Sequence, residues 1–421
     1  MMKKTKILIL IILVLTAANI LKAQEEYRMG SLYSAFGVGL PRYSASHRTD
    51  AMGIQGIGLL GNYINNLNPA SNTYLKYTLV TVGMSGLMLK TSNDTKSVTM
   101  TDANVSGFNL GVPVWNPYNV VVIFGFNPVS AVQYKITGFV NQNGTNFTET
   151  FAGLGGLSRL NLGFAGKPFR FLSLGAEYNY TFGNVKELSY FDFNSSTTIN
   201  TFIQTENDLK GYYFKGGAVF ELGYVFPRSV FFDNLNIGFY YQNKYNLSSY
   251  VDKITYSSLG FDSTSSSYPD ADMPESFGIG ISKKFGRQLI LSSDIMFQKY
   301  SKFKSTSLLP GNYTDNYRLG VGFEILPNPE SDKSFFQKLY YRGGFSYDNS
   351  IMKINNEQID NYSVSLGVAV PLNNEAAIDF DVTAGTRGRT DLGYVKDNYI
   401  KFNLGLNFGE FWFMRSTRQD L

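Results

Sequence analysis

The chain has 421 residues, no cysteine and a formal net charge of +4. The lack of cysteine excludes disulfides, thiolate metal sites and a lipid-anchored N-terminal cysteine. Aromatic residues reach 15% and glycine occupies 41 positions, whereas charged residues make up 17%, below the ~25% of ordinary soluble domains. This composition favours strands over helices, and no Pro- or Ser-rich linker divides the chain.

The N-terminus has the pattern of a secretory signal peptide. Lys3, Lys4 and Lys6 precede an apolar run from Ile7 to Leu15, and a short tail ends at Ala23. The apolar run is shorter than the ~20 residues that a membrane-spanning helix needs, which argues against an uncleaved anchor. We predict a signal peptide at 1–23. The rest of the chain has 33 basic and 33 acidic residues, so we expect no nucleic-acid partner.

The next segment, 24–72, does not have the pattern of a spanning strand. It contains "AMGIQGIGLLGNYINNLNPAS", which is Gly-rich, apolar and nearly uncharged. The Asn68-Pro69 step is a turn former. Glycine lets such a segment bend and pack closely against a wall. We therefore expect an N-terminal hatch that plugs a lumen and ends near this turn.

From Tyr74 onward the sequence alternates with period two. In "YRLGVGFEI", for example, Tyr317, Leu319 and Val321 oppose Arg318 and Gly320. About fourteen such segments are recognisable. They span 74–91, 103–114, 119–137, 156–166, 170–189, 210–227, 233–250, 273–286, 288–301, 313–326, 336–348, 359–371, 374–387 and 397–412. Short turns alternate with long loops, the longest at roughly 138–155, 190–209 and 251–272.

These features predict an all-β protein, a fourteen-stranded antiparallel transmembrane β-barrel that spans 73–413, followed by a periplasmic tail at 414–421. An even strand number with short turns on one side is typical of outer-membrane barrels. Lipid offers no hydrogen bonds, so only helices or a closed barrel can span it. A soluble barrel of this size is the alternative, but it would need large apolar side chains inside, and here the inner face is built of Gly, Asn and charges. A barrel this wide needs a water-filled or plugged lumen.

Several stretches together resemble the FadL/TodX family of outer-membrane transporters for hydrophobic compounds, in particular its members from Bacteroidetes-like bacteria. They are "AMGIQG...NNLNPAS", "MPESFGIGISKKFGRQLILSSDIMFQKYSKF", "YYRGGFSYDNS", "SLGVAVPL" and "AGTRGRTDLGYVKDNYIKFNLGLNFGEFWF". The resemblance covers the mature chain. It implies a hatch in the lumen, ligand capture near the extracellular loops, and lateral exit through the wall near a kinked third strand.

The resemblance directs attention to two Pro-containing breaks. Asn68, Pro69 and Ala70 match the family's hatch signature, and Pro128 interrupts the third predicted strand. Because proline cannot donate to a ladder, it implies a bulge or a break there. An ordinary bulge that relieves barrel curvature is the alternative. The sharper hypothesis is that the tripeptide packs against the Pro128 region and gates a side opening.

Other candidate sites follow from composition. Phe139, Phe147, Phe151, Leu154 and Phe191 lie near the long loops and are a candidate ligand groove, or an aromatic girdle at the membrane interface. Mixed lumen charges suggest pairs between wall and hatch, although one cation among them is a candidate partner for a ligand carboxylate. These charges are Lys215, Glu221, Asp294, Arg318, Glu324, Arg342, Asp379, Asp381, Arg387 and Lys401.

The sequence predicts no enzyme, cofactor or metal site. His47 is the single histidine, and no nucleophile-elbow motif accompanies it. The predicted function is passive outer-membrane transport of hydrophobic small molecules, such as long-chain fatty acids or aromatic hydrocarbons. The steps would be loop capture, hatch movement and lateral release by a monomer surrounded by outer-membrane lipid. The alternative is a PorV-like anchor or shuttle of type IX secretion, with a secreted protein as its partner.

Overall fold

The computed structural model describes the chain in eight stretches. They are residues 30–43, 46–142, 145–193, 199–328, 334–354, 356–373, 375–391 and 395–412. The predicted signal peptide and the predicted tail lie outside these stretches, so both stay predictions. Among the described residues, no helix is both long enough and apolar enough to cross a membrane.

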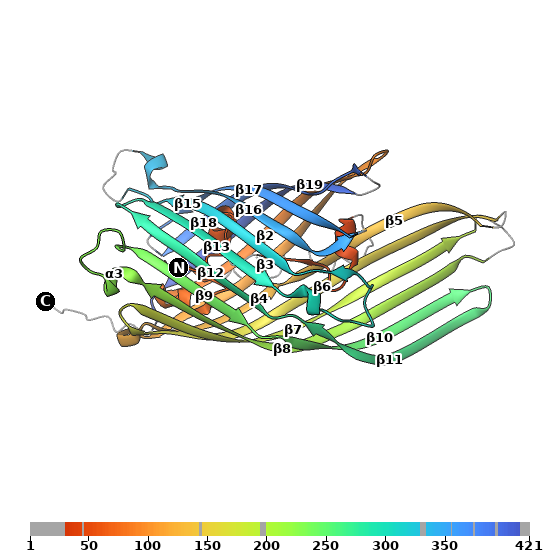
Figure 1. Cartoon of the computed structure of the whole chain (residues 1–421), viewed down its shortest axis with the longest axis horizontal. Coiled ribbons are helices and arrows are strands. Elements are labelled where there is room, and N and C mark those ends of the chain that lie inside the picture. The colour runs from red at the N-terminus through yellow and green to blue at the C-terminus, as the bar shows by residue number, and fades with distance from the viewer. Residues whose placement is uncertain are drawn as a thin grey trace, which may run out of the picture.

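Fourteen antiparallel strands close into one barrel, which confirms the predicted fold class (Figure 1). The first strand, β2, pairs along its whole length with the last, β19. Each predicted segment overlaps one barrel strand. Interrupted strands carry two labels, and the bounds are β2 Thr78–Ser92, β3 Ser97–Trp115, β4 Val120–Pro128 with β5 Ser130–Gln142, β6 Thr145–Phe169, β7 Leu172–Asp192, β8 Thr201–Glu221, β9 Leu235–Gln242 with β10 Tyr245–Ser257, β11 Gly260–Met273 with β12 Ser276–Phe285, β13 Leu289–Gln298, β15 Asn316–Ile325, β16 Tyr340–Ile354, β17 Glu357–Pro371, β18 Ala376–Gly388 and β19 Lys396–Glu410.

The period-two pattern sorts side chains between lipid and lumen. In β15, Leu319 and Val321 are 38% and 51% exposed and point outward, whereas Glu324 is fully buried. The same division recurs around the barrel, with outward Phe, Leu, Ile and Val and inward Gly, Asn, Ser and charged residues. An outward apolar band is what a barrel in a bilayer requires, because the wall has no other apolar partner there.

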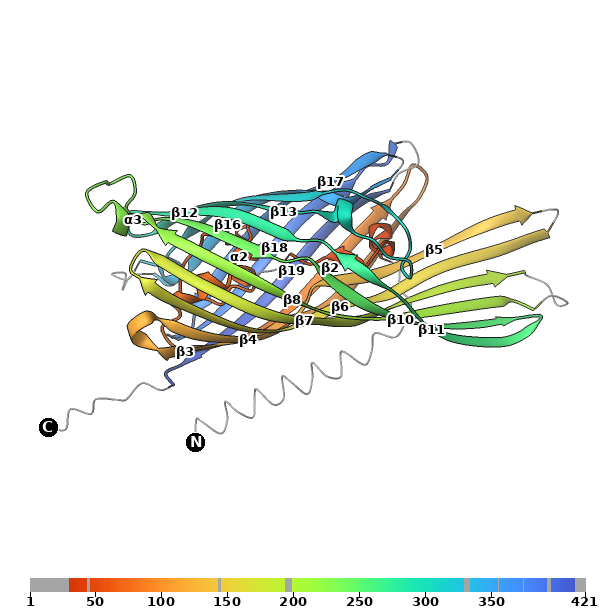
Figure 2. The same ribbon diagram turned by 60° about the horizontal axis from the view of Figure 1, so that its bottom comes forward.

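One side of the barrel rises well above the rest of the rim. The outer parts of β5, β6, β7, β8, β10 and β11 continue past the rim as a curved sheet, which we call the arm (Figures 1 and 2). The stretches at 138–155, 190–209 and 251–272, expected as loops, are therefore mostly strand: β6 pairs with β5 out to Thr145↔Gln142, for example. Their outermost residues, such as 260–270 of β11, are exposed on both faces, and the weak alternation there concealed the strands.

The opposite end carries the short connections and the end of β19. Figure 1 shows α3 (Leu222–Val225) at this end, together with the last described residues of the chain. Two further short helices join strands here, η3 (Asn116–Tyr118) and η5 (Phe335–Lys338). Short periplasmic turns and long extracellular extensions are the usual polarity of outer-membrane barrels, so the arm is on the extracellular side.

Residues 30–75 fold inside the barrel (Figure 2). They contain η1 (Leu32–Ala35), β1 (Leu40–Pro41), α2 (His47–Ala51) and η2 (Pro69–Tyr74). A reciprocal capping box starts α2: the Ser46 hydroxyl accepts from the Thr49 amide, and the Thr49 hydroxyl accepts from the Ser46 amide. We call residues 30–75 the hatch. Four apolar clusters join the hatch to the wall, so the core of this protein lies at that interface.

The connection between β13 and β15 folds over the extracellular end of the lumen. It contains η4 (Tyr300–Lys302) and the short strand β14 (Asn312–Tyr313), which pairs with β16. Phe303 and Leu308 of this connection pack in one cluster with Ala35 and Val38 of the hatch. The Ser307 hydroxyl also contacts Asn207 and Ser249 of the arm. We call residues 299–315 the lid.

Candidate functional site

The hatch lies on pairs of wall glycines. Gly175 and Gly217 face each other across β7 and β8, and the Asn68-Pro69-Ala70 tripeptide passes directly over them. A Cβ built at Gly175 would come within 2.6 Å of the Ala70 nitrogen, and one at Gly217 would overlap the Asn68 side chain. Glycine is therefore required at both positions for this close approach. The neighbouring Gly216 has no atom within 4 Å of such a Cβ.

The tripeptide itself is fixed by local hydrogen bonds. Asn68 Oδ1 accepts from the Ala70 amide at 3.1 Å, and Asn68 Nδ2 donates to the Ile57 carbonyl at 2.6 Å. Pro69 occupies the first turn of η2, where its missing N–H costs no hydrogen bond. The Asn-Pro step thus begins the short helix that connects the hatch to β2. All three residues are buried.

Further glycine pairs follow the same principle along the hatch. Gly238 and Gly280 are opposite each other in β9 and β12, and the hatch backbone at Ile57 crosses them. Gly83 of β2 and Gly405 of β19 form another pair, and the His47 ring occupies the space that two Cβ atoms would fill. The unusual inward glycines in the sequence are therefore hatch contacts, which periodicity alone did not reveal.

Buried polar groups of the wall also hold the hatch backbone. The Asp294 carboxylate of β13 accepts from the amides of Gln55 and Gly56, at 2.9 and 2.7 Å. Lys215 Nζ donates to the Asn66 carbonyl at 2.7 Å and lies 2.8 Å from Glu177. These side chains are almost completely buried. Buried charges need such partners, because an unpaired one would carry a large desolvation penalty.

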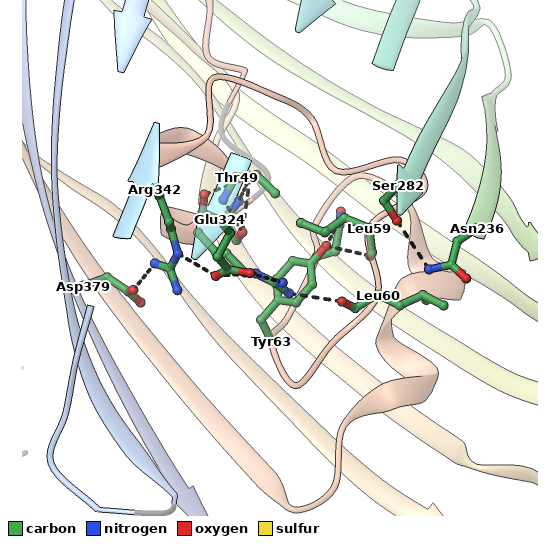
Figure 3. Close-up of polar contacts among 12 residues, drawn as sticks. Thr49, Leu59, Leu60, Tyr63, Asn236, Ser282, Glu324, Arg342 and Asp379 are labelled. Atoms are coloured by element: carbon green, nitrogen blue, oxygen red, sulfur yellow. Dashed lines mark hydrogen bonds and ion pairs between the residues drawn. The ribbon is translucent and has the colours of Figure 1, made fainter. Parts of the chain in front are cut away.

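A chain of ion pairs crosses from the hatch to three wall strands (Figure 3). Arg48 Nε of α2 donates to both oxygens of Glu324 in β15 at 3.1 Å. Glu324 accepts from Arg342 Nε of β16 at 2.8 Å, and Arg342 also pairs with Asp379 of β18. Planar guanidinium groups suit such bridging between carboxylates. Three of the predicted lumen charges thus bond the hatch directly, Lys215, Asp294 and Glu324, and Arg342 and Asp379 extend this network along the wall.

The remaining predicted lumen charges pair within the wall or line a cavity, and two of them, Glu221 and Arg318, also contact Tyr74 and Tyr43 of the hatch. Glu221 pairs with Lys167 at 2.6 Å, Arg318 with Asp348 at 3.1 Å, and Arg387 approaches Asp397 to 4.0 Å. Asp381 is buried and accepts from Asn403 Nδ2 at 2.5 Å. Lys401 forms no ion pair within the described stretches.

The third barrel strand is broken at Pro128. Below the break, β4 pairs with β3 from Val120↔Trp115 to Phe126↔Phe108. Above it, β5 pairs with β6 on one side and with the two-residue hatch strand β1 on the other. In the described part of the chain, no backbone ladder joins β5 to the outer half of β3. Backbone pairing in the wall is therefore interrupted above Pro128, between β3 and β5, and we call this interruption the side opening.

The hatch reaches this opening through residues other than the tripeptide. Asn66 Nδ2 donates to Asn127 Oδ1 at 3.3 Å, next to Pro128. The Arg42 amide donates to the Val129 carbonyl at 2.9 Å. The tripeptide instead lies on Gly175 and Gly217, so its link to Pro128 runs through Asn66. Gating by Asn68, Pro69, Ala70 and Pro128 stays a proposal.

A cavity of about 260 Å³ lies beside the side opening. Its apolar lining includes Leu40 and Pro41 of the hatch, Leu87 and Leu89 of β2, Met100 of β3, and Pro128. Arg42, Arg318, Arg387 and Lys401 also line it. Of these, Arg42 and Lys401 have no ion-pair partner within 4.0 Å in the described stretches. The carboxylates of Asp50 and Asp102 line it too, so the cavity combines apolar side chains with charges of both signs.

The sequence matches the BamG family over residues 1–418. The chain belongs to the BamG family. No curated protein matches it. Solved structures with the same fold include CymD, a monoaromatic hydrocarbon channel (17% identity, TM-score 0.59, 90% of this chain and 100% of that chain). The toluene transporter TbuX of Ralstonia pickettii (16%, 0.58, 90% and 99%) and a FadL homologue of Pseudomonas aeruginosa (14%, 0.59, 89% and 99%) are similar as well.

For this BamG-family chain, the structural neighbours establish the fold of FadL-type outer-membrane barrels. These neighbours are channels and transporters for hydrophobic compounds rather than enzymes. The described residues contain no group of three or more His, Cys, Asp or Glu side chains placed to hold a metal ion. His47, the single histidine, packs against the wall glycines, and burial lowers its pKa.

The predicted ligand groove is only partly assembled. Phe147 and Phe151 of β6 lie 6.3 and 6.1 Å from Phe191 of β7, measured between ring centroids. Alternate residues of a strand lie on the same face. All three phenylalanines lie on the face of Leu157 and Val185, which are buried in the lumen cluster. Phe139 and Leu154 have the opposite parity and point away. Phe193 completes the cluster, 5.4 Å from Phe147.

Proposed function

We propose that this BamG-family chain is a passive outer-membrane channel for hydrophobic small molecules, such as long-chain fatty acids or aromatic hydrocarbons. The observation that carries the proposal is the side opening above Pro128 together with the cavity beside it. A cavity with both apolar and charged lining next to a gap in the wall suits an amphipathic ligand, which would pass into the membrane without crossing the polar lower lumen. The described hatch and lid stand between this cavity and the outside.

In the proposed route, Phe147, Phe151 and Phe191 capture a ligand on the inner face of the arm. The lid and the hatch share one apolar cluster, so a ligand that displaces Phe303 or Leu308 also disturbs Val38. The ligand then enters the cavity, where Arg42 and Lys401 suit a carboxylate head group and Leu87 and Met100 contact its chain. Release follows through the gap between β3 and β5.

The hatch has to shift for this route to open. Its contacts with the wall are apolar clusters, glycine pairs, and buried hydrogen bonds and ion pairs. Asn68, Pro69 and Ala70 lie at the start of η2, which leads on to β2. We assign this tripeptide to the gate because the Asn68 amide donates to Asn65 Oδ1, and the adjacent Asn66 bonds Asn127 next to Pro128. Pro128 then marks the lower edge of the exit.

A disulfide lock tests this mechanism. The chain has no native cysteine, so Leu40→Cys in the hatch with Ala131→Cys, which lies opposite it in β5, introduces the only pair. We expect the oxidised double variant to lose uptake of a fluorescent fatty acid and of toluene, and a reductant to restore it. The single variant Leu40→Cys is the matched control. Full uptake by the oxidised protein would show that the hatch does not gate transport.

A second candidate function is an anchor or shuttle for a secreted protein, as in PorV-like barrels. The arm favours it, because long ordered extensions suit a stable protein partner. Transport predicts that an apolar molecule stays with the purified barrel. The shuttle function predicts an empty barrel that co-purifies with a secreted protein.

A further inference from the structure

The arm has two outer strands, and they differ in how their free edges are built. At one border, β11 pairs with β10; at the other, β5 pairs with β6. Such edges carry rows of unpaired N–H and C=O groups, which natural proteins normally protect with charge, proline or a cover. The comparison of these two edges shows that only one is protected.

The β11 edge is protected. It runs through "GFDSTSSSYPDADM", in which Asp262 and Asp270 add charge and Pro269 removes a donor. Every residue from 260 to 270 is exposed. Proline and charges on an edge strand prevent pairing with another chain.

The β5 edge carries few such features. Residues 135–141 read "KITGFVN", with one charge, no proline and several residues of high strand propensity. Phe139 is 85% exposed and Ile136 is 42% exposed. An exposed edge with little charge and no proline is expected to pair with another strand.

The hatch shows which groups point outward from β5. Both the amide and the carbonyl of Gln133 bond the Ser34 hydroxyl, at 2.9 and 2.8 Å, on the side away from β6. Leu40 of β1 pairs opposite Ala131 on the same side. Because the direction alternates along a strand, Lys135, Thr137, Phe139 and Asn141 direct their N–H and C=O groups to this side as well. In the described stretches nothing bonds these four residues there.

We infer that the β5 edge from Lys135 to Asn141 is a strand-addition site for an extended segment of another polypeptide at the cell surface. A row of alternating backbone donors and acceptors fits a strand. The hatch strand β1 already pairs with the same edge of β5 lower down, at Ser130 and Ala131. This surface lies outside the lumen, so the inference does not depend on the proposed transport function.

The side chains beside the edge define the partner's chemistry. Ile136 and Val140 point to the inner face, next to the cluster of Phe147 and Phe151. Lys135 and Phe139 point to the outer face. The incoming segment should therefore alternate, with apolar side chains toward the inner face and an acidic side chain opposite Lys135. A second copy of this chain in the same membrane does not fit, because its β5 runs in the same direction and has the same single positive charge.

Two variants at Thr137 separate the contribution of the backbone amide to peptide binding from that of the side chain. Thr137→Pro removes one outward amide without touching the ladder to β6, since proline is tolerated where its N–H position faces solvent. Thr137→Ala changes the side chain and keeps that amide. The probe is a synthetic peptide of about eight residues with alternating valine and threonine and one glutamate. The matched control peptide is N-methylated at alternate amides, so that it cannot pair.

We expect the unmodified peptide to bind the full-length protein and to slow hydrogen exchange at Lys135, Thr137, Phe139 and Asn141. Thr137→Pro should weaken binding about tenfold, the value of one hydrogen bond of roughly 1.4 kcal/mol. Thr137→Ala and the methylated peptide separate this effect from side-chain contacts. In intact cells, a photo-crosslinker at Thr137 should give a polypeptide adduct, and one at Ser265 on the β11 edge should not.

Two results would overturn the inference. One is fast exchange of the four amides both with the peptide and in native outer membranes. The other is a crosslink from position 137 to lipopolysaccharide only, with Thr137→Pro and Thr137→Ala indistinguishable. Exchange at Ile136 and Val140, whose amides bond β6, reports whether each variant is folded.

Discussion

The arm is formed by outer parts of strands that also form the lower barrel. The two regions differ in how their backbone and side-chain polar groups are bonded. In the lower barrel, β2 closes on β19 and buried wall charges bond the hatch. In the arm, β5 and β11 end the sheet without closing it. The comparison indicates that the lower part holds the hatch through many buried contacts, whereas the arm leaves strand edges unpaired within the described stretches.

The largest expected effect is in the buried ion network. Arg342→Met leaves Glu324 and Asp379 buried without their shared cation, and removing one partner of a buried pair costs about 3–5 kcal/mol. We expect a matching loss in the free energy of unfolding, measured in urea after refolding into detergent. Lys299→Met, which breaks an exposed pair with Glu275 near the arm, should change stability little. Equal losses would contradict the distinction between the two regions.

The next effect is overpacking at a glycine pair. Gly217→Val places side-chain atoms in the space of Asn68, and overpacking of this kind typically costs about 1–3 kcal/mol. We expect the hatch to become sensitive to protease added from the periplasmic side. The control is the adjacent Gly216→Val, where a Cβ meets no atom within 4 Å. If both variants were equally resistant, the hatch would not depend on the glycine pair.

A smaller effect concerns pH. Burial lowers the pKa of His47, next to Asp50, Asp379, Lys401 and Arg342. A histidine with a depressed pKa binds fewer protons folded than unfolded, so stability falls as the pH drops below about 6.5. We expect the melting temperature of the wild type to decline faster than that of His47→Asn between neutral pH and pH ~5. Parallel curves for the two proteins would show that His47 does not contribute to the pH dependence of stability.

The smallest expected effect lies in the capture cluster. Phe151→Ala should weaken binding of a fatty acid by about 0.5–1.5 kcal/mol, the typical value of an aromatic contact. Phe139→Ala, on the opposite face, should leave ligand binding unchanged. Calorimetric titration of the two variants measures the difference. An equal effect would mean that the ligand does not use the inner face.

The fold could be predicted from the sequence because each spanning strand must present apolar side chains to lipid on one face. Tyr317 to Ile325 alternates for that reason, and the strand count followed. The arm was not predicted, since Thr201 to Glu206 is half-buried on both faces and shows no apolar period.

The site was readable only in part. The break at Pro128 has a local cause, the missing N–H, and so it could be placed. The partners of Asn68 could not be placed: Gly175 and Gly217 lie more than a hundred residues away, and only closure of the barrel brings them beneath the hatch. Arg48 was missed for the same reason, because its partner Glu324 lies 276 positions further along the chain.

Native mass spectrometry of the protein, purified gently from its own outer membrane, tests the central claim most directly. We expect an apolar molecule to remain bound to the wild type and to be lost from Met100→Trp, which fills the cavity beside the side opening. A wild-type barrel that carries no small molecule and instead co-purifies with a secreted protein would contradict transport and support the shuttle function.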